Sequence, residues 1–374
     1  MAQPKTKTPV PALPLDPALV PRLSAFFNAH KRDLPWRRTR DAYAVWVSEI
    51  MLQQTRVEAV IPYYERFLQT LPDLASLAAC PDDLLYKLWE GLGYYSRARN
   101  LREAARVLVA AGENALPRTR EGLIRLPGIG RYTAGAVASI AFGEAVPAVD
   151  GNVLRVTARL CDSYCNILDD AFRLAAENAW APLIPRDGTA GTFNQSLFEL
   201  GATVCLPRTP HCETCPVKDL CRAFAAGHAE ELPVRLARTQ KTVSDKTVWL
   251  VTNGRGDRVV LRRRPGKGVL AGLFEFPNTE GTVAATDAAE AFKKTFSGVT
   301  PLSVSALPPA RHIFTHLVWI LQGFHVTVSD AALDTFPRVP TGDALFVCSR
   351  EALDDAYSLP SAFRTYRNYF THQK

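Results

Sequence analysis

Four cysteines in the middle of the chain constrain its fold more than any other feature of the sequence. They are Cys205, Cys212, Cys215 and Cys221, in the spacing C-x6-C-x2-C-x5-C. Four thiolates so close along the chain can enclose one small inorganic core, and the uneven intervals do not fit the two CxxC pairs of a zinc site. The spacing therefore predicts a [4Fe–4S] cluster, although it differs from the ferredoxin patterns. Disulfides or a zinc ion are the alternatives.

The hydrophobic pattern changes after these cysteines, which indicates more than one domain in a chain of 374 residues. Residues 1–15 read as a Pro-rich tail that is predicted to be disordered. Between residues 16 and 230 apolar residues recur at spacings of three and four, which predicts an all-α domain of short helices. Residues 231–245 are polar and charged, as in a linker. Residues 246–374 hold strand-length runs of β-branched and aromatic residues with two amphipathic helices, which predicts an α+β domain.

Composition narrows the setting in which the chain works. No apolar run approaches the roughly 20 residues that span a bilayer, and the N-terminal residues lack the apolar core of a signal peptide. The net charge of +7 favours a polyanionic partner, although charge alone does not establish nucleic-acid binding. The cysteines outside the cluster motif are scattered among apolar residues. These features predict an intracellular, reducing compartment.

Residues 121–142, EGLIRLPGIGRYTAGAVASIAF, predict two helices joined by a tight hairpin. Gly128 and Gly130 permit backbone conformations that side chains forbid, and they leave amide N–H groups free at the start of the second helix. A hairpin of this kind holds a DNA phosphate without reading the bases. For the glycines alone, an ordinary corner between helices is the alternative; the full string LPGIG-R-x-T-A is more specific.

The string LPGIGRYTAGAVASIAFGEAVPAVDGNVLRV, with the four-cysteine loop after it, resembles the helix–hairpin–helix DNA glycosylase superfamily in its endonuclease III-like branch. Within that branch, LPWR, WVSEIMLQQTRVEAVIPYYERF and LWEGLGYYSRARNL are similar to the MutY-type adenine DNA glycosylases. The resemblance covers residues 20–228 closely and the C-terminal domain more loosely. It implies an all-α helix–hairpin–helix glycosylase domain with an iron–sulfur loop and an α+β Nudix-like C-terminal domain. The implied activity is removal of adenine opposite 8-oxoguanine or guanine in double-stranded DNA, as part of base excision repair.

Cleavage of an adenine N-glycosidic bond needs a proton for the departing base and stabilisation of positive charge on the sugar, and two carboxylates can divide these tasks. Glu49 is the predicted acid, because apolar neighbours can raise its pKa so that it keeps a proton near neutral pH. The resemblance places its counterpart at N7 of the base. Asp150, at the start of a predicted helix, is suited in its ionised form to stabilise the sugar cation or briefly to form a covalent adduct with the sugar, with Asn152 orienting water or substrate. The alternatives are a surface pair of Glu49 with Arg56 and a plain helix N-cap at Asp150.

Tyr132 decides between two kinds of glycosylase. In bifunctional relatives such as endonuclease III, a lysine at this place attacks the sugar and forms a Schiff base. A tyrosine cannot do this. The chain is therefore predicted to be monofunctional, releasing the base and leaving the abasic strand largely intact.

A base that leaves the stack leaves a gap behind it. The resemblance implies that Gln54, Leu92 and Tyr94 lie in the segments that fill this gap, with Gln54 and Tyr94 against 8-oxoguanine and its neighbouring base. An amide beside an aromatic ring also occurs in any protein core. The resemblance further implies that the adenine pocket is lined by Arg32, Trp36, Arg37 and Gln195.

In the C-terminal region, GVLAGLFEFP and ARHIFTHLVW resemble the Nudix-like domain of adenine glycosylases, which reads 8-oxoguanine through a Phe-Ser-His loop. Here the loop is Phe314-Thr315-His316, in which threonine keeps the hydroxyl group and adds a methyl group. The region after Gly272 lacks the clustered glutamates that hold magnesium in Nudix hydrolases, so no pyrophosphatase activity is predicted.

Two groups of arginines have open interpretations. Those at positions 99, 102 and 106 share a helical face that either contacts phosphates or remains solvated. Those at positions 262–264 end a strand and either touch DNA or lie at an exposed sheet edge.

Three functions are compatible with these patterns. The first is adenine glycosylase activity, with the protein expected to be a monomer in the cytoplasm or at the nucleoid. The second is an endonuclease III-like enzyme for oxidised pyrimidines, against which Tyr132 and the Nudix-like domain argue. The third is a cluster-bearing DNA-binding or redox-sensing protein without catalysis, against which Glu49 and Asp150 argue.

Overall fold

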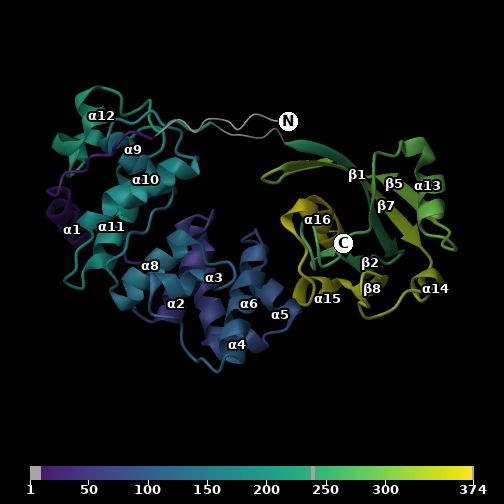
Figure 1. Cartoon of the computed structure of the whole chain (residues 1–374). Helices are drawn as coiled ribbons and strands as arrows, with labels where there is room; N and C mark the ends of the chain where they lie inside the picture. Colours follow the sequence, from purple (N-terminus) through teal and green to yellow (C-terminus); the bar gives the residue numbers. More distant parts are fainter. Residues whose placement is uncertain (1–9, 237–240, 373–374) are drawn as a thin grey trace, which may run out of the picture. The chain divides into compact units, whose positions relative to one another are not determined.

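The structure is a computed structural model that describes residues 10–236 and 241–372. Most of the predicted tail and part of the predicted linker lie outside these residues. The described chain forms two compact units (Figure 1). The helical unit contains the residues up to Ala79 and those from Arg99 to Leu236, and the sheet unit contains residues 80–98 and the residues after 240. No helix in the described ranges combines the length and apolarity needed to cross a membrane.

The helical unit is a set of short helices joined by turns, as the three- and four-residue spacing of its apolar residues predicts. One helix, α6 (Ser96–Ala110), begins in the sheet unit and continues into the helical unit. The others are α1 (Leu19–His30), α2 (Ala42–Leu52), α3 (Val57–Thr70), α4 (Leu74–Ala79), α7 (Arg120–Ile124), α8 (Arg131–Phe142), α9 (Gly151–Leu160), α10 (Asp170–Trp180), α11 (Ala190–Thr203) and α12 (Arg222–Ala225), with one-turn 3-10 segments at Pro35–Arg37, Ala181–Leu183, Cys212–Thr214 and Lys218–Leu220.

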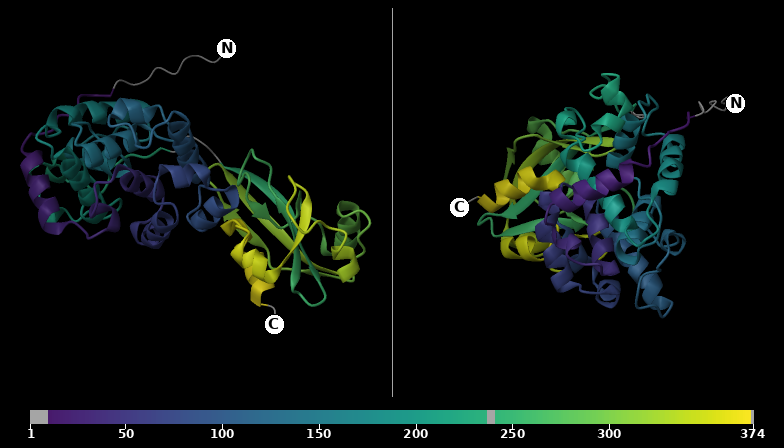
Figure 2. Two further views of the ribbon diagram at one scale, coloured as in Figure 1. Left: turned by 90° about the horizontal axis from the view of Figure 1, so that it is seen from below. Right: turned by 90° about the vertical axis from the view of Figure 1, so that its left-hand side faces the viewer.

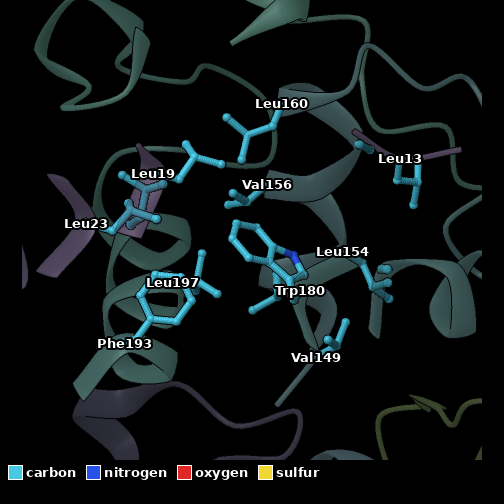
Figure 3. Packing of buried hydrophobic residues seen from close by; sticks show 14 of the residues in the cluster. Leu13, Leu19, Leu23, Val149, Leu154, Val156, Leu160, Trp180, Phe193 and Leu197 are labelled. Atoms are coloured by element: carbon cyan, nitrogen blue, oxygen red, sulfur yellow. The ribbon is translucent and has the colours of Figure 1, made fainter. Parts of the chain in front are cut away.

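A core around Trp180 holds α9, α10 and α11 together (Figure 3). The indole is fully buried, its Nε1 donates to Thr157 Oγ1 at 2.8 Å, and its ring packs on Phe193 with 5.9 Å between centroids. Val156 and Leu197 line the same cluster. Because a buried aromatic residue removes a large apolar area from water, this contact fixes α9 relative to its neighbours. The start of α9 carries Asp150.

The predicted hairpin lies between α7 and α8 and depends on one glycine. Gly128 has φ of +74°, and a Cβ atom there would lie 2.5 Å from Cβ of Asn100. Only glycine meets both requirements at low energy. Gly130 follows in an extended conformation as the N-cap of α8, where a Cβ atom would meet no atom within 4 Å.

The sheet unit is built on an eight-stranded mixed sheet in the order β3-β2-β1-β7-β5. The long strands β1 and β7 run parallel, in register from Thr242 opposite Leu317 to Asn253 opposite Val328, and β4, β6 and β8 pair with β1, β7 and β2. The strands are β1 (Thr242–Asn253), β2 (Arg258–Arg263), β3 (Phe274–Glu275), β4 (Asn278–Glu280), β5 (Ser303–Ala306), β6 (Ala310–Ile313), β7 (Leu317–Val328) and β8 (Leu345–Ser349). The helices are α5 (Asp82–Trp89), α13 (Ala288–Thr295), α14 (Asp330–Leu333), α15 (Arg350–Asp355) and α16 (Arg364–His372).

Helices cover both faces of this sheet, with α16 on one side and α13 on the other (Figures 1 and 2). Because successive residues of a strand point to opposite faces, Val248 joins the core under α16 and Trp249 the core under α13. Gly323 allows the first core to close, since a Cβ atom there would lie 2.2 Å from the ring of Tyr366. The prediction of an α+β C-terminal fold is confirmed.

Residues 80–98 fall within the helical region of the sequence, yet in the structure they group with the sheet unit. Asp83 pairs with Arg263, and Lys87 Nζ donates to the carbonyl of Asp354. Glu90 accepts from Arg367 Nη1 at 2.9 Å. These contacts link α5 and the residue after it to β2, α15 and α16, which local sequence patterns do not reveal.

The exposed-edge interpretation of the arginines at positions 262–264 is wrong, whereas their contact with DNA stays a prediction. Strand β2 pairs with neighbours on both sides, so it is not an edge strand. Arg262 and Arg264 bind the fully buried carboxylate of Glu275, while Arg263 pairs with Asp83. A buried charge must be paired, so these arginines serve the fold.

The arginine face predicted on α6 is only partly open: Arg106 is exposed and Arg99 is half-buried. Arg102 is buried, and Arg106 Nε donates to the carbonyl of Ala78 at 3.0 Å.

Candidate active site

A cavity of about 850 Å³ opens in the helical unit between the ends of α2, α8, α9 and α11. It brings together eleven of the residues singled out in the sequence: Arg32, Trp36, Arg37, Glu49, Gln54, Gly128, Gly130, Tyr132, Asp150, Asn152 and Gln195. These residues come from segments that are far apart along the chain. The cavity therefore contains both candidate carboxylates and the candidate DNA hairpin.

Glu49 lies on the buried part of α2, only 5% exposed. Tyr132 Oη donates to its Oε2 at 2.6 Å. Burial raises the pKa of Glu49 to about 7, opposed by this hydrogen bond and assisted by the charge of Asp150. A carboxyl group with such a pKa can hold a proton near neutral pH and still release it, which a general acid requires. A solvated surface pair with Arg56 is excluded by the burial.

Tyr132 lies in the first turn of α8, directly after the hairpin, and this turn positions its side chain. Burial and the nearby charges of Glu49 and Asp150 raise the pKa of its phenol well above the usual value. The phenol therefore stays protonated and acts as a hydrogen-bond donor. Its ring contacts Phe198 edge-on, with 5.7 Å between centroids, which holds the hydroxyl group in place.

Asp150 is the N-cap of α9, as the alternative interpretation of this residue predicts. Its Oδ1 accepts from the backbone N–H of Val153 at 2.8 Å, and its Oδ2 accepts from Asn152 Nδ2 at 2.8 Å. Burial raises its pKa, and these hydrogen bonds oppose the rise. A carboxylate in a buried cavity with fixed donors is a preorganised partner for developing positive charge. Capping and catalysis are therefore compatible at this residue.

Asn152 is held from both sides. Its Oδ1 accepts from Arg155 Nη2 at 2.9 Å, and Arg155 also donates to the carbonyls of Gly201 at 2.7 Å and Cys205 at 2.8 Å. This chain of hydrogen bonds runs from Asp150 to the first cysteine of the cluster motif. Arg155 was not singled out in the sequence; its only signal was a charged residue among the apolar positions of α9, which also holds Arg159.

Arg32 and Arg37 meet at a carboxylate that sequence reasoning missed. Glu199 on α11 is fully buried and accepts from Arg32 Nε at 2.9 Å and Arg37 Nη2 at 2.7 Å. Although burial raises the pKa of Glu199, the hydrogen bonds from the two arginines lower it to about 2. Glu199 stays ionised and fixes both guanidinium groups at the wall of the cavity. Only the tertiary structure places it beside residues more than 160 positions away in the chain.

Two of the three residues predicted to fill the gap in DNA have an unusual backbone conformation. Gln54 has φ of +59° and Tyr94 has φ of +48°, and non-glycine residues rarely adopt this left-handed region. Strained conformations of this kind often occur at functional sites. Gln54 lines the cavity of the helical unit, whereas Leu92 and Tyr94 belong to the sheet unit. Tyr94 is 47% exposed and Leu92 is buried.

The Phe314–His316 loop connects β6 to β7 in the sheet unit. Phe314 N–H donates to the carbonyl of Leu317 at 2.8 Å, which closes the turn, and the Phe314 ring packs on Trp319 at 4.9 Å. Thr315 and His316 are exposed at the tip. The loop thus presents a hydroxyl group and an imidazole to an outside partner.

The four cysteines of the motif line one small apolar cavity beside α9 and α11, together with side chains such as Val156 and Val217. All four are free thiols, which rules out the disulfide alternative. In the described part of the chain no group of three or more His, Cys, Asp or Glu side chains is placed to hold a single metal ion. Arg159 Nη1 donates to Cys205 Sγ at 3.2 Å, as suits a thiolate ligand. The donor set therefore fits an iron–sulfur cluster.

Comparison with known families agrees with this geometry. Residues 47–182 match the family model "HhH-GPD superfamily base excision DNA repair protein", residues 205–221 the "iron-sulfur binding domain of endonuclease III", and residues 247–368 the "NUDIX domain". A solved structure titled "thermostable thymine-DNA glycosylase" is 32% identical, with a TM-score of 0.50 over 56% of this chain and 96% of that one. The fold and these matches thus assign residues 47–182 to the HhH-GPD superfamily and residues 247–368 to the NUDIX domain family.

Among curated relatives, the adenine DNA glycosylase of Mus musculus is 37% identical over 84% of this chain and 72% of its own length. That of Arabidopsis thaliana is 40% identical over 78% of this chain, which spans only 54% of that relative. The chain belongs to the adenine DNA glycosylase family. The prediction of a [4Fe–4S] cluster is confirmed by the iron–sulfur match, and Cys205, Cys212, Cys215 and Cys221 are the residues that would hold it.

Proposed function

We propose that the chain hydrolyses the N-glycosidic bond of adenine opposite 8-oxoguanine or guanine in double-stranded DNA, and leaves the abasic strand intact. The observation that carries the proposal is that two carboxylates, Glu49 and Asp150, line one cavity. One of them, Glu49, has its pKa raised to about 7, and the other, Asp150, is held by fixed hydrogen-bond donors.

The two carboxylates divide the reaction between them. Glu49 gives its proton to N7 of the flipped adenine, the bond between the base and C1′ breaks, and adenine leaves as a neutral molecule. Asp150 stabilises the positive charge that develops on the sugar, and a water molecule adds to C1′ and loses a proton. Tyr132 donates to Glu49 and has no amine with which to form a Schiff base.

The pocket for the flipped adenine is supported by the fixed arginines. Glu199 holds Arg32 and Arg37 at the cavity wall, and Trp36 and Gln195 complete the lining. A base pocket of this kind excludes water and offers an aromatic surface with a few directed polar groups.

The sheet unit is proposed to recognise the opposite strand. The turn with Leu92 and Tyr94, together with Gln54, fills the gap left by the adenine, and Thr315 and His316 contact 8-oxoguanine. The hairpin with Gly128 and Gly130 holds a phosphate. When bound, the cluster supplies a rigid cross-link that orders the loop of residues 205–221. We further propose that the protein acts as a monomer in a reducing, intracellular compartment.

One assay tests this function. The protein is incubated with duplexes that carry adenine opposite 8-oxoguanine or thymine glycol opposite adenine, and released base and strand breaks are measured separately. Release of adenine without breaks supports the proposal, and Glu49→Gln abolishes release while binding persists. Strand cleavage at thymine glycol, or normal turnover by Glu49→Gln, contradicts it.

A further inference from the structure

The turn at residues 91–94 is held by the C-terminal end of the chain. Directly before this turn, Glu90 Oε1 accepts from Arg367 Nη1 at 2.9 Å and from the backbone N–H of Leu359 at 3.2 Å. Lys87 Nζ donates to Glu90 Oε2 at 2.9 Å and to the carbonyl of Asp354. Glu90 is therefore a fixed carboxylate, and all of these residues belong to the sheet unit.

A hollow of about 340 Å³ lies between this turn and the start of α16. Its polar wall consists of Glu90, Ser361, Arg364, Arg367 and Asn368, and the backbone at Gly91 forms the side next to the turn. Ser361, Arg364 and Asn368 are exposed. An outside group can therefore reach a hydroxyl, a guanidinium and an amide together.

Of the charged side chains that line the hollow, only that of Arg364 has no partner of opposite charge within the described residues. Arg367 is neutralised by Glu90, and it also binds Asp354 at 2.8 Å. The side chain of Arg364, in contrast, forms no hydrogen bond or ion pair within residues 10–236 and 241–372. The hollow as a whole thus carries the single positive charge of Arg364.

Arg364 also lies close to the loop that was assigned to lesion recognition. Burial lowers the pKa of His312, and the charge of Arg364 lowers it further, so the two side chains interact electrostatically. The ring of His312 packs on Phe314, with 4.5 Å between centroids. Arg364 therefore shares the hollow with Gly91 and interacts with His312, which in turn contacts Phe314 of the loop.

We propose that this hollow binds one backbone phosphate of the strand that contains 8-oxoguanine, with Arg364 as its cation and Ser361 and Asn368 as hydrogen-bond donors. The inference rests on the proposed function, under which the turn and the loop both meet the 8-oxoguanine nucleotide. A phosphate diester beside that nucleotide carries one negative charge, which matches the charge of Arg364. Such a contact positions the strand without reading bases.

Salt dependence of binding tests the charge of the site. Arg364→Gln is compared with Arg338→Gln, an equally large change at an exposed arginine after α14 that pairs with Asp334. Both changes are made in the Glu49→Gln protein, and the probe is a duplex with adenine opposite 8-oxoguanine. We expect Arg364→Gln to reduce the slope of log K against log salt by about 0.9, the value for one phosphate contact, and Arg338→Gln to leave it unchanged. Equal slopes for the two variants overturn the proposal.

Single neutral linkages locate the phosphate. Methylphosphonates are placed one at a time along the strand that carries 8-oxoguanine, and each duplex is tested with and without Arg364→Gln. We expect the loss of affinity from Arg364→Gln to vanish at a linkage next to 8-oxoguanine and to persist elsewhere. A loss that persists at every linkage of that strand, or vanishes only in the adenine strand, overturns the proposal. Adenine release by the protein with Glu49 intact is measured in parallel, so failure of the glycosylase function is seen separately.

Discussion

The pKa of Glu49 gives the most direct test of the proposed chemistry. With a pKa of about 7, Glu49 is about nine-tenths protonated at pH 6 and about one-tenth protonated at pH 8. If the protonated form is the catalyst, the single-turnover rate of adenine release falls about tenfold per pH unit above 7.

Tyr132→Phe should shift the fall in the rate of adenine release to higher pH. The hydrogen bond from Tyr132 lowers the pKa of Glu49, so its removal raises the pKa. A hydrogen bond to a charged group contributes about 1.5–3 kcal/mol, and one pKa unit corresponds to about 1.4 kcal/mol. The midpoint of the alkaline limb should therefore move upwards by about 1–2 units.

The assay is single-turnover release of adenine between pH 5.5 and 9.5, with enzyme in excess over a duplex that carries adenine opposite 8-oxoguanine. Tyr164→Phe is the matched control, because its hydroxyl group is exposed and donates to Glu231 instead. That variant should keep the wild-type midpoint. A rate that is flat from pH 6 to 9, or the same midpoint in both variants, would refute the assignment of Glu49 as the acid.

Further predictions concern stability and DNA binding. The pKa of Glu49 is raised from 4.5 to about 7, so protonation of its side chain stabilises the folded protein, and this contribution is fully present below pH 4.5 and lost as pH rises through 7. Glu49→Gln keeps the side chain neutral at every pH. It should therefore raise the free energy of unfolding by on the order of 3 kcal/mol at pH 8, and by less at pH 5.5, in denaturant titrations. Gly128→Ala should destabilise the fold by about 1–3 kcal/mol and weaken DNA binding, since φ is positive and Asn100 blocks a Cβ atom, while Gly130→Ala should keep wild-type stability. Glu199→Gln leaves two guanidinium groups without their carboxylate and should cost about 3–5 kcal/mol at pH 7; the wild-type contribution is present above about pH 4.5 and is lost as pH falls towards 2. Removal of the cluster by an iron chelator should lower DNA affinity and increase protease cleavage within residues 205–221, whereas unchanged cleavage would contradict a structural role.

Much of the fold could be predicted because its signals are local. The spacing of apolar residues indicates helices before the cysteines and strands after them, and the structure has both. What could not be predicted is the grouping of α5 with the sheet unit. That grouping depends on pairs such as Asp83 with Arg263 and Glu90 with Arg367, which lie 180 and 277 positions apart. No local pattern records a contact at that range.

For the candidate site, the sequence alone determined the chemical groups: the acid at Glu49, the carboxylate at Asp150, the tyrosine in place of a lysine, and four thiols at cluster spacing. Residue type and spacing are properties of the chain itself, so they can be read without coordinates. Only the tertiary structure decided the state of those groups. It buries Glu49 and thereby raises its pKa, and it ties Arg32 and Arg37 to Glu199. Burial and pairing depend on neighbours brought from distant segments, and these neighbours determine the protonation state and position of each group.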